Sequence, residues 1–456
     1  MSERLVVVGG DAAGMAAAAT AKRRAGDDLD VVVVERTGWV SYSACGIPYW
    51  VAGDVDGPDG LVARWPDQHR ANGIDVRLHT EAVAVDMAAR EVVVRTTGSD
   101  ATERLGFDQL VLATGAEPRR PGVPGADADG VHGLQTLDDG CRLLATLAGL
   151  PSDRVSRAVV VGAGYIGIEM AEACVRRGLQ VTVVDQAPAP MGTLDPDLGA
   201  HIEEAMTSMG MEVVMNAGVT AFETDAAGRV RAVLAAGRTF PADVVVLGLG
   251  VYPRSALAGD AGLPLGESGG IRVEPSGAVP GVDGVWAAGD VVEVWDRVAK
   301  QHRHMPLGTH ANKLGRIVGR NLTGADEVFP GVVTTAITKV CDLEVARTGM
   351  SQQQADRAGL GAVSSTIETT TIAGYLPESQ PMTVRLTAER TGGRLLGAQI
   401  VGRRGSAIRI DILATALWAD MGVHDVIDLD LAYAPPFSSA WDPVQVAARA
   451  LQTRLA

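Results

Sequence analysis

Two stretches of the chain share one pattern of apolar and polar positions. Residues 5–35 contain a β-branched run, a glycine-rich turn, a segment of small residues, basic residues and a second β-branched run that ends in an acid. Residues 158–185 repeat these features in the same order. A short apolar run before a glycine turn is typical of a buried strand, and the small-residue segment after it favours a helix. The pattern predicts one βαβ unit twice, the copies lying about 150 residues apart.

Each predicted unit carries glycines at the positions where a dinucleotide would bind. In such turns the first glycine permits the tight bend, the second lets the backbone approach a pyrophosphate, and the third packs the helix against the strand. The second copy has the complete fingerprint at 162–167, with Asp185 at the spacing of an acid that binds a ribose. The first copy, 9–14, departs from it because Asp11 occupies the middle glycine position, although Glu35 supplies the acid. Glycine turns also end many strands that bind nothing, but two copies in the same context predict two dinucleotide sites.

The residues around the two predicted sites indicate different dinucleotides. Residues 186–190 place no Arg or Lys close behind Asp185, which favours NADH over NADPH unless a distant loop supplies a cation. Two further apolar runs end in small turns, at 110–115 and at 285–290, and the acid Asp290 closes the second. An acid at the carboxyl end of a strand in an open α/β sheet lies where ligands bind, and it indicates a flavin in the first site. A surface-turn aspartate is the alternative.

Composition and charge narrow the class of protein. The 456 residues suit two or three domains of ordinary size. A net charge of −15 argues against broad binding to nucleic acid or to anionic membranes, although it is compatible with local basic patches. The 55 glycines show no collagen period and therefore indicate tight turns and close approach of the backbone to ligands.

The cysteines and the apolar runs indicate a soluble, cytoplasmic protein. The cysteines at 45, 141, 174 and 341 form no Cys-x-x-Cys pair and no Cys/His spacing suited to zinc, so a disulfide scaffold is excluded and a reducing compartment is favoured. The apolar N-terminal run superficially resembles a secretion signal, but Asp11 interrupts it and the basic residues follow it rather than precede it. No apolar run reaches the ~18 residues needed to span a bilayer.

In their order along the chain, these motifs resemble those of the flavin-dependent pyridine nucleotide–disulfide oxidoreductases, and the resemblance covers essentially the whole chain. It implies an α/β fold with two Rossmann-like dinucleotide-binding domains, for FAD and for NAD, and a C-terminal α+β dimerisation domain. The implied divisions are an FAD-binding domain in two segments (1–117 and 251–325), an NAD(P)H-binding domain (118–250) and the dimerisation domain (326–456).

The resemblance also implies which residues hold the two cofactors. It places FAD on Gly9, Gly14, Glu35, Thr114, Gly115 and Asp290, and NADH or NADPH on Gly162, Gly164, Gly167 and Asp185. The further positions implied to line one or the other cofactor are Gly10, Ala13, Arg36, Val83, Ala113, Tyr165, Ile166, Gly250, Gly289, Gly308, Thr309 and Ala311.

The segment 41–49, Ser-Tyr-Ser-Ala-Cys-Gly-Ile-Pro-Tyr, indicates the subgroup. The glutathione, lipoamide and mercuric reductases carry two cysteines here, whereas this chain has Cys45 alone. It therefore resembles the single-cysteine branch, which comprises CoA-disulfide reductase, NADH oxidase, NADH peroxidase and persulfide reductase. A lone cysteine acts with a partner outside its motif, either a substrate thiol in a mixed disulfide or an oxygen in a sulfenic acid. If Cys45 begins a helix whose first turn accommodates Pro48, its thiolate should be favoured.

Other positions separate the members of this branch. Oxidases and peroxidases carry a histidine at the place of Ala12, so the alanine indicates poor peroxide reduction and a likeness to CoA-disulfide and persulfide reductases. His302, His304 and His310 cluster without a further ligand, and we expect a loop that leads back into the flavin domain, with no metal site. A buried, inert thiol is the alternative for Cys45 and the expectation for the other three cysteines.

Tyrosines and polar residues complete the site that the resemblance implies. Tyr375 and Tyr433 match positions that reach across the dimer to the partner's cysteine in CoA-disulfide reductases, where a phenol can hydrogen-bond or protonate a leaving thiolate. Interface packing is the alternative role. Cations at a helix end would hold the phosphates of CoA, unless they form an ordinary solvated helix end. The implied substrate ligands are Lys22, Arg23, Ser41 and Ser43.

The sequence thus predicts a homodimeric flavoenzyme in which NADH reduces FAD and FAD reduces a mixed disulfide on Cys45. The expected acceptor is CoA disulfide, with coenzyme A present as substrate or as a mixed-disulfide adduct, although Ala44 replaces the Asn of some CoA-disulfide reductases. Three alternatives stay open: a persulfide or polysulfide reductase, an NADH oxidase or peroxidase, and a non-catalytic flavoprotein that senses redox state or serves as a binding module.

Overall fold

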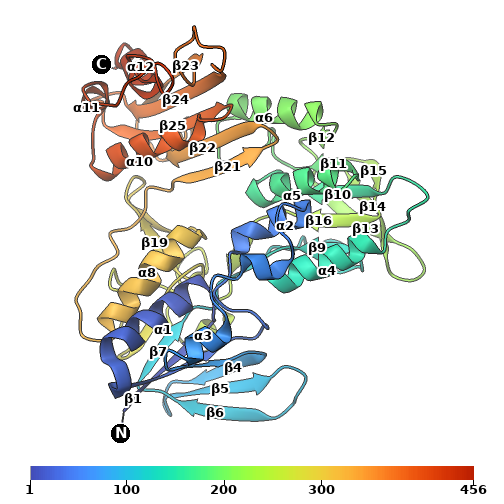
Figure 1. Ribbon diagram of the computed structural model, residues 1–456, viewed down its shortest axis with the longest axis vertical. Helices are drawn as coiled ribbons and strands as arrows, with labels where there is room; N and C mark the ends of the chain where they lie inside the picture. Colours follow the sequence, from blue (N-terminus) through green and yellow to red (C-terminus); the bar gives the residue numbers. More distant parts are fainter. Residues whose placement is uncertain (1, 456) are drawn as a thin grey trace.

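The computed structural model describes residues 2–455 (Figure 1). A five-stranded sheet forms the centre of its first unit. Its strands, in order across the sheet, are β18 (Val285–Ala287), β7 (Gln109–Leu112), β1 (Glu3–Val8), β2 (Leu29–Val34) and β3 (Ile74–Arg77). All four strand pairings are parallel. Because β18 comes from far along the chain, two separate segments build this first unit.

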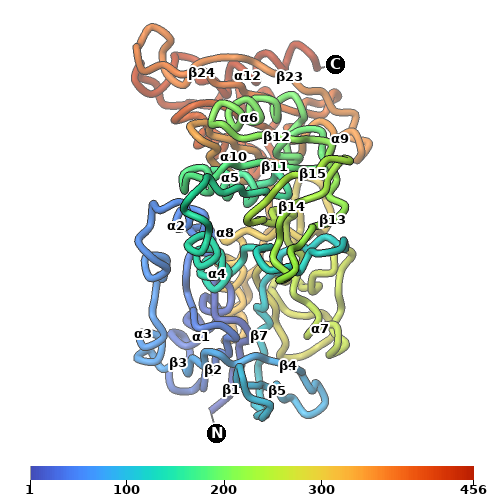
Figure 2. The backbone as a smooth tube through the Cα atoms, turned by 90° about the vertical axis from the view of Figure 1, so that its right-hand side faces the viewer, coloured from blue at the N-terminus to red at the C-terminus, as the bar shows by residue number. Residues whose placement is uncertain are grey.

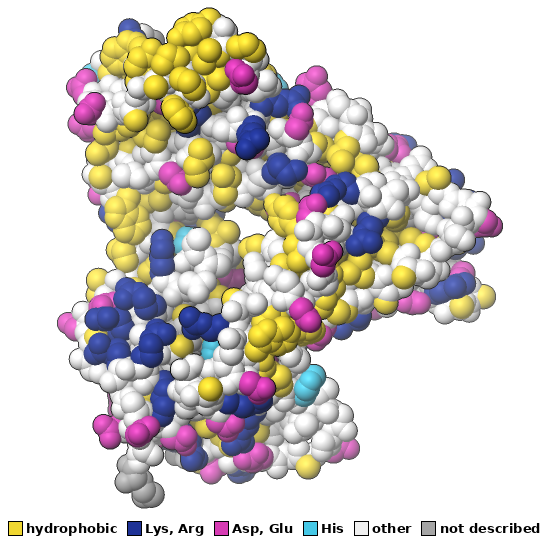
Figure 3. Space-filling view, viewed as in Figure 1, with side chains coloured by type: hydrophobic (Ala, Val, Ile, Leu, Met, Phe, Trp, Pro, Cys, Tyr) yellow, Lys and Arg dark blue, Asp and Glu magenta, His cyan; other side chains and the backbone are white. Residues whose placement is uncertain are grey.

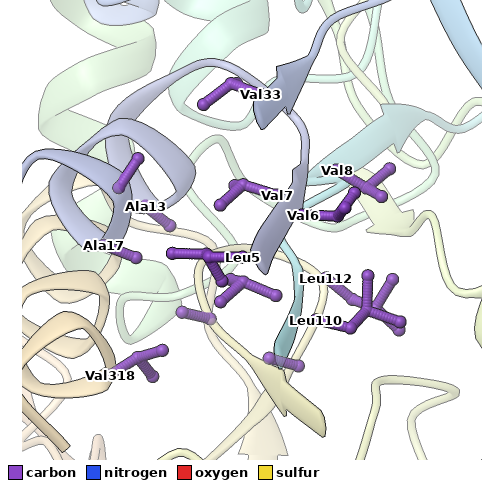
Figure 4. Packing of buried hydrophobic residues seen from close by; sticks show 14 of the residues in the cluster. Leu5, Val6, Val7, Val8, Ala13, Ala17, Val33, Leu110, Leu112 and Val318 are labelled. Carbon is purple, nitrogen blue, oxygen red and sulfur yellow. The ribbon is translucent and has the colours of Figure 1, made fainter. Parts of the chain in front are cut away.

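Apolar residues occupy both faces of the central strand β1. Leu5, Val6 and Val7 are completely buried. Figure 4 shows Leu5 and Val7 on the side of helix α1 (Ala12–Ala25), whereas Val6 and Val8 point toward the opposite face. A continuous apolar run of this kind is what a parallel strand needs when both of its faces are covered.

The helices α1 and α8 (Gly308–Asn321) cross in very close contact on this sheet. Gly315 and Gly319, one turn apart on α8, lie against the carbonyl oxygens of Ala13 and Ala17, and a Cβ at either glycine would overlap them. At the far end of α1, Arg24 Nε donates to the hydroxyl of Thr323 at 2.8 Å. Because these two positions are glycines, α8 of the second segment can pack directly against α1 of the first segment.

A second five-stranded parallel sheet repeats the arrangement. Its strands, in order, are β12 (Glu212–Val214), β11 (Gln180–Val184), β10 (Arg157–Val161), β16 (Val244–Leu247) and β9 (Val131–Gly133). Helix α5 (Tyr165–Arg176) joins β10 to β11 as α1 joins β1 to β2. The predicted pair of Rossmann-like βαβ units is confirmed. Two more helices belong to this second unit, α4 (Leu137–Ala148) and α6 (Pro196–Ser208).

The chain passes between the two units through one short ribbon. Strand β8 (Ala116–Pro118) leaves the first unit, and β17 (Val251–Pro253) returns antiparallel to it. We propose that the domain boundaries lie on this ribbon, at residues 117/118 and 250/251. Each unit also carries an antiparallel sheet that the sequence pattern does not predict: β4 (Thr80–Asp86), β5 (Glu91–Thr96) and β6 (Thr102–Gly106) in the first, and β13 (Val219–Thr224), β14 (Val230–Ala235) and β15 (Arg238–Pro241) in the second.

The C-terminal unit is an antiparallel sheet covered by helices, which confirms the predicted α+β class. Its strands, in order, are β21 (Ala336–Val340), β22 (Leu343–Gly349), β25 (Leu395–Gly402), β24 (Pro381–Glu389) and β23 (Ala362–Thr370). The helices are α9 (Gln352–Arg357), α10 (Ile410–Trp418), α11 (Val423–Ile427) and α12 (Pro443–Gln452). Leu413 of α10 and Val444 of α12 are completely buried in its core.

Buried polar contacts join the second unit to the C-terminal unit. Figure 2 shows α6 of the second unit lying against the C-terminal unit. The backbone N–H of Asp195 donates to Gln399 Oε1, and Gln399 Nε2 donates back to Asp195 Oδ2, both at 2.7 Å. Arg385 forms ion pairs with Asp195, at 3.2 Å, and with Asp197. Asp195 and Gln399 are buried and Arg385 is largely buried, so losing one of these partners would leave the others unsatisfied, and the two units are held in a defined relation.

The histidine segment forms a strand, and the predicted loop is wrong for His302 and His304. Strand β20 (Gln301–His304) pairs antiparallel with β19 (Glu293–Asp296). The His304 ring makes a 2.7 Å hydrogen bond to the carbonyl oxygen of Asp290, which ties the hairpin to the end of β18. His310 lies on α8. The local sequence is polar and gives no strand signal, and the pairing with β19 and the contact to residue 290 produce the strand.

Candidate functional site

The two glycine turns have nearly the same backbone geometry. Gly9 and Gly162, which follow β1 and β10, have φ angles of +107° and +105°, in the region that favours glycine. Gly14 and Gly167, in the first turn of each following helix, lie against the carbonyl oxygens of Gly9 and Gly162, so that a Cβ at either would overlap them. This close packing lets α1 and α5 begin directly at the ends of their strands.

The acid at the end of each second strand is fixed beside its glycine turn. Glu35 Oε2 accepts a hydrogen bond from the N–H of Gly10 at 2.8 Å, and Asp185 Oδ2 accepts one from Ala163 at 2.6 Å. The second carboxylate oxygen accepts from the backbone that follows, from Thr37 at 2.8 Å and from residue 187 at 2.7 Å. Both acids are therefore held beside the turns at which the sequence predicts the dinucleotides.

The residues predicted for FAD surround the carboxyl edge of the first sheet, and their packing fits a flavin dinucleotide. Residues 113–115 follow β7, the neighbour of β1, and Gly289 and Asp290 follow β18, the strand beyond β7, so both turns lie on the same side of the turn after β1. A Cβ at Gly289 would lie 2.8 Å from that of Ala13, which shows how closely the backbones approach. Burial raises the pKa of Asp290 to about 6. This edge of the sheet therefore has a tightly packed backbone and carboxyl groups that can accept hydrogen bonds from the hydroxyl groups of a ligand.

Other residues predicted for the cofactors lie at the margins of these turns. Gly308 and Thr309 are exposed in the first turn of α8, where Ala311 is buried, whereas Arg36 is exposed just after β2. Val83 is partly exposed at a bulge of β4. The remaining predicted positions follow the strands or begin the helices described above: Ala113, Thr114, Gly115, Gly164, Ile166 and, with φ +79°, Gly250.

Helix α5 presents two further polar side chains beyond its glycine turn. Tyr165 is half-buried, and burial raises the pKa of its hydroxyl. Glu169, one turn later, accepts a hydrogen bond from the hydroxyl of Thr338 at 2.6 Å, and burial raises its pKa as well. Nothing in the local sequence of α5 shows that Glu169 lies close enough to Cys45 to affect its thiol.

Cys45 lies in a short 3-10 turn, Ala44–Gly46, directly before helix α2 (Ile47–Ala52). Although this segment precedes β7 in the first unit, Trp50 and Val51 of α2 pack into the core of the second unit, beside α4 and α5. Arg177 Nε of the second unit donates to the Val51 carbonyl at 2.5 Å. Cys45 is therefore exposed at the junction of the two units, between the turns predicted to hold FAD and the nicotinamide cofactor.

The surroundings of Cys45 raise the pKa of its thiol, and the expected stabilisation of the thiolate is wrong for this structure. Partial burial is the main cause, and the negative charges of Glu169, Asp290 and Asp11 add to it. Helix α2 has only six residues and begins after the cysteine, so its dipole is small and does not offset three carboxylates.

Ser41 and Ser43 belong to the segment that leads into Cys45. Ser41 has a φ of +49°, which is strained for serine, and its hydroxyl lies 3.0 Å from the Nε2 of His69. His69 is almost completely buried at the end of the short helix α3 (Pro66–Arg70), and burial lowers its pKa. Ser43 is exposed, and its backbone N–H donates to the carbonyl of Leu61 at 2.8 Å. No local pattern in the sequence marks His69 as a partner of Ser41.

Tyr375 and Tyr433 lie on neighbouring loops of the C-terminal unit. The side chains of Tyr375 and Tyr433 are 75% and 54% exposed, and that of Phe437 is 75% exposed. The N–H of Ala373 donates to the carbonyl of Pro435 at 3.1 Å, which joins the two loops. Figure 3 shows apolar side chains gathered over this unit. Within the described chain neither tyrosine hydrogen-bonds to the Cys45 segment, so a single subunit does not bring them together.

The cations predicted to hold substrate lie at the far end of α1. Lys22 Nζ donates to the carbonyl of Leu29 at 2.8 Å, so its position is set by the protein, whereas Arg23 is exposed and donates a hydrogen bond to the hydroxyl of Thr20 at 3.3 Å. Figure 3 shows Lys and Arg side chains gathered over α1 and the adjoining α8. The further cations on these two helices are Arg24 and Lys313, together with Arg316 and Arg320, which both form ion pairs with Glu327.

The other cysteines differ in burial, and the expectation of a buried thiol is wrong for Cys141. That residue is exposed on α4, where only Leu137, Gly140 and Leu143 are buried. Cys174 is completely buried in α5, as expected. Cys341 is half-buried in the turn between β21 and β22, with its sulfur 3.2 Å from that of Met209.

Metal-binding clusters and membrane-spanning helices are absent from the part of the chain that the structure describes. Among residues 2–455, no group of three or more His, Cys, Asp or Glu side chains is arranged to hold a metal ion. In the same part of the chain, no helix has the length and apolar character that crossing a membrane requires.

Comparison with known proteins identifies relatives along the whole chain. Residues 3–313 match the family described as "Pyridine nucleotide-disulphide oxidoreductase", and residues 335–444 match its dimerisation domain. The NAD(P)H coenzyme A polysulfide/persulfide reductase of Pyrococcus horikoshii is 34% identical over 454 residues, covering 99% of both chains. An NADH oxidase of Methanocaldococcus jannaschii is 30% identical over 449 residues, covering 98% of both.

Solved structures agree with these matches. The reduced CoADR-RHD of Bacillus anthracis superposes with a TM-score of 0.94 at 32% identity, covering 99% of this chain and 80% of that one. The NAD-dependent persulfide reductase from A. fulgidus gives a TM-score of 0.93 at 36% identity, covering 99% of this chain and 83% of that one.

Proposed function

Because the chain belongs to the pyridine nucleotide-disulphide oxidoreductase family, and is therefore an enzyme that uses FAD and NAD(P)H, we propose that it reduces the disulfide of coenzyme A through Cys45. The observation that carries the proposal is the position of Cys45. It is a lone cysteine, exposed at the junction between the two dinucleotide-binding units. A thiol placed there can exchange with an incoming disulfide while it stays next to the source of electrons.

FAD, which the turns after β1, β7 and β18 would hold, would supply the two-electron chemistry that links NADH to a disulfide at Cys45. The Cys45 thiolate attacks CoA disulfide, so that a bond forms between Cys45 Sγ and one CoA sulfur while the other CoA leaves as a thiolate and takes up a proton. Two electrons then break the mixed disulfide, which releases the second CoA and restores the Cys45 thiolate. The sum is NADH + H⁺ + CoA disulfide → NAD⁺ + 2 CoA.

The basic face of α1 and α8 supports a substrate that carries phosphates. Arg23 lies eleven residues, or about 16 Å, along α1 from Ala12, whose neighbour Asp11 contacts the Cys45 segment. An extended pantetheine arm can bridge such a span, with its thiol at Cys45 and its phosphates at the basic end. Guanidinium groups suit phosphate recognition because they donate two parallel hydrogen bonds. These cations give an acidic protein a local site for an anionic substrate.

Replacing Arg23 by Glu should raise the KM for CoA disulfide by about ten-fold, because one charge-assisted hydrogen bond to phosphate is lost and a repulsive charge is added. The kcat and the KM for NADH should not change. Steady-state kinetics at low and high salt check this, since an electrostatic contribution weakens with salt.

Arg231→Glu makes the same charge change at an exposed site on β14 of the second unit and should leave the kinetics unaltered. Pantethine, a disulfide that lacks the phosphates, should be reduced equally well by wild type and Arg23→Glu. An equal loss with pantethine would show that Arg23 does not act on the phosphates.

The exposed loops of Tyr375 and Tyr433 support a second part of the proposal. The C-terminal unit belongs to a dimerisation domain. We propose that the chain forms a homodimer in which these two phenols, supplied by the partner subunit, approach Cys45 and donate a hydrogen bond to the departing thiolate. Their large exposure within one subunit agrees with that role.

Asp185 supports NADH as the reductant. Both of its carboxylate oxygens accept backbone hydrogen bonds, which hold the negative charge at the position of the ribose. A carboxylate there favours the free hydroxyl groups of NADH and repels the 2′-phosphate of NADPH.

Reduction of a CoA persulfide is the second candidate, because relatives at 34% and 36% identity are named as persulfide reductases. The same Cys45 would then serve a reaction that balances as NADH + H⁺ + CoA persulfide → NAD⁺ + CoA + H₂S. Oxygen or peroxide reduction is disfavoured by Ala12, which provides no acid beside the sulfur.

Rates of NADH oxidation with CoA disulfide, CoA persulfide, oxygen and hydrogen peroxide, measured on one preparation, test the proposal. The kcat/KM should be highest with CoA disulfide, and the protein purified without reductant should carry a CoA adduct on Cys45 that dithiothreitol removes. A higher kcat/KM with the persulfide would select the second candidate. Fastest turnover with oxygen or peroxide, or slow turnover with every acceptor at full FAD occupancy, would refute both.

A further inference from the structure

The two loops that carry Tyr375 and Tyr433 contain no helix or strand of their own. The first, residues 371–380, joins β23 to β24, and the second, residues 428–442, joins α11 to α12. Loops of this kind are ordinarily more mobile than the elements they connect. Some further interaction must hold them if the two phenols are to occupy defined positions.

Arg409, the residue directly before α10, makes hydrogen bonds to both loops. Its side chain is only 11% exposed. One nitrogen, Nη2, donates to the carbonyl oxygens of Thr371 at 2.5 Å and Phe437 at 2.7 Å, which lie four residues before Tyr375 and four residues after Tyr433. Because a guanidinium is planar and its donors point in fixed directions, it sets these two carbonyl groups relative to each other.

The guanidinium of Arg409 is itself held on its other sides. Nη1 donates to the carbonyl oxygen of Gly405, and Nε to Asp442 Oδ2 at 3.4 Å. The same oxygen of Asp442 accepts a hydrogen bond from the hydroxyl of Ser438 at 3.0 Å, and Oδ1 accepts one from the N–H of Val444, in the first turn of α12, at 2.9 Å. Asp442 is buried, and a buried carboxylate is stable only when it is paired and hydrogen-bonded. Arg409 is therefore fixed to the start of α12 as well as to the two loops.

We propose that Arg409 is a positioning residue of the shared active site: it holds the two loops in the arrangement in which each subunit presents Tyr375 and Tyr433 to Cys45 of the partner subunit. The inference rests on the proposed role of the two phenols. Arg409 acts through the loops and not on the reacting atoms. Its effect is on the rate, because a proton donor assists a departing thiolate only within hydrogen-bond reach.

Arg409→Lys in the holoenzyme tests the inference. The variant keeps the positive charge but replaces the planar fork with a single ammonium group. The kcat with CoA disulfide should fall at least about ten-fold, because the phenols are misplaced, while flavin reduction by NADH should keep its rate. Hydrogen–deuterium exchange, followed by mass spectrometry, should become faster in peptides that cover 371–380 and 428–442. Asp442→Asn, which can still cap α12, should give smaller changes of the same kind and decides the question if Arg409→Lys does not fold.

Combination with the tyrosine variants separates positioning from a general loss of stability. Added to Tyr375→Phe/Tyr433→Phe, Arg409→Lys should lower kcat no further, because the hydroxyl groups that it positions are gone. A fall by the same factor in both backgrounds would overturn the inference. The matched control is Arg454→Lys. Arg454 also donates to a backbone carbonyl of this unit, that of Ser364 on β23 at 2.9 Å, and its replacement should change neither kcat nor the exchange of the two loops.

Two other results would overturn the inference: wild-type exchange of both loops in a folded Arg409→Lys protein, and faster exchange with wild-type kcat. A Tyr375→Phe/Tyr433→Phe enzyme with wild-type kcat would refute the proposed role of the phenols, and the inference with it. Both differ from failure of the proposed function as a whole, which turnover independent of Cys45 would show.

Discussion

Replacing Cys45 by Ser should lower the turnover of CoA disulfide by at least about a thousand-fold, because a serine hydroxyl cannot form the mixed disulfide. The side chains have nearly the same size and Cys45 is exposed, so the fold should not change. NADH should still reduce the bound flavin at the wild-type rate, since that step does not involve the thiol. Stopped-flow absorbance separates flavin reduction from disulfide turnover.

Cys141→Ser is the matched control, because Cys141 is also exposed and free but lies on α4 of the second unit. Its turnover should equal that of the wild type. A Cys45→Ser enzyme that keeps disulfide turnover, with unchanged FAD content, would refute the proposed mechanism and place the reacting group elsewhere.

Replacing Gly167 by Val should slow the reduction of flavin by NADH at least about a hundred-fold, since the side chain costs several kcal/mol of overpacking where the nicotinamide cofactor would bind. The first atom of that side chain would already overlap the carbonyl oxygen of Gly162. FAD should stay bound, because the first sheet is a separate unit with its own glycine turn.

Gly192→Val places the same side chain at an exposed position of the second unit where a Cβ meets nothing within 4 Å. This control should reduce flavin at the wild-type rate and melt at the same temperature. Gly167→Ala tests the same overlap with a smaller change, in case the valine variant does not fold. Wild-type NADH kinetics in a folded Gly167→Val protein would show that the second turn does not bind the cofactor.

The local sequence predicts the two βαβ units because each depends on interactions between neighbouring residues. Glycines at 9 and 162 are needed for φ angles above +100°, and those at 14 and 167 for helix–strand contact. The apolar runs predict buried parallel strands, since both faces are covered. The acids that end β2 and β11 follow at a regular spacing. The lone cysteine and the missing histidine at position 12 are likewise visible in the sequence.

Only the tertiary structure reveals the environment of Cys45. Helix α2 follows a segment of the first unit yet buries Trp50 in the second, which brings Glu169 of α5 toward the thiol. The result is a raised pKa, opposite to the expectation from a helix start. The strand that contains His304 depends in the same way on a distant partner. Pairing, desolvation and charge–charge interaction depend on distances between residues far apart in the chain, and a local pattern does not contain those distances.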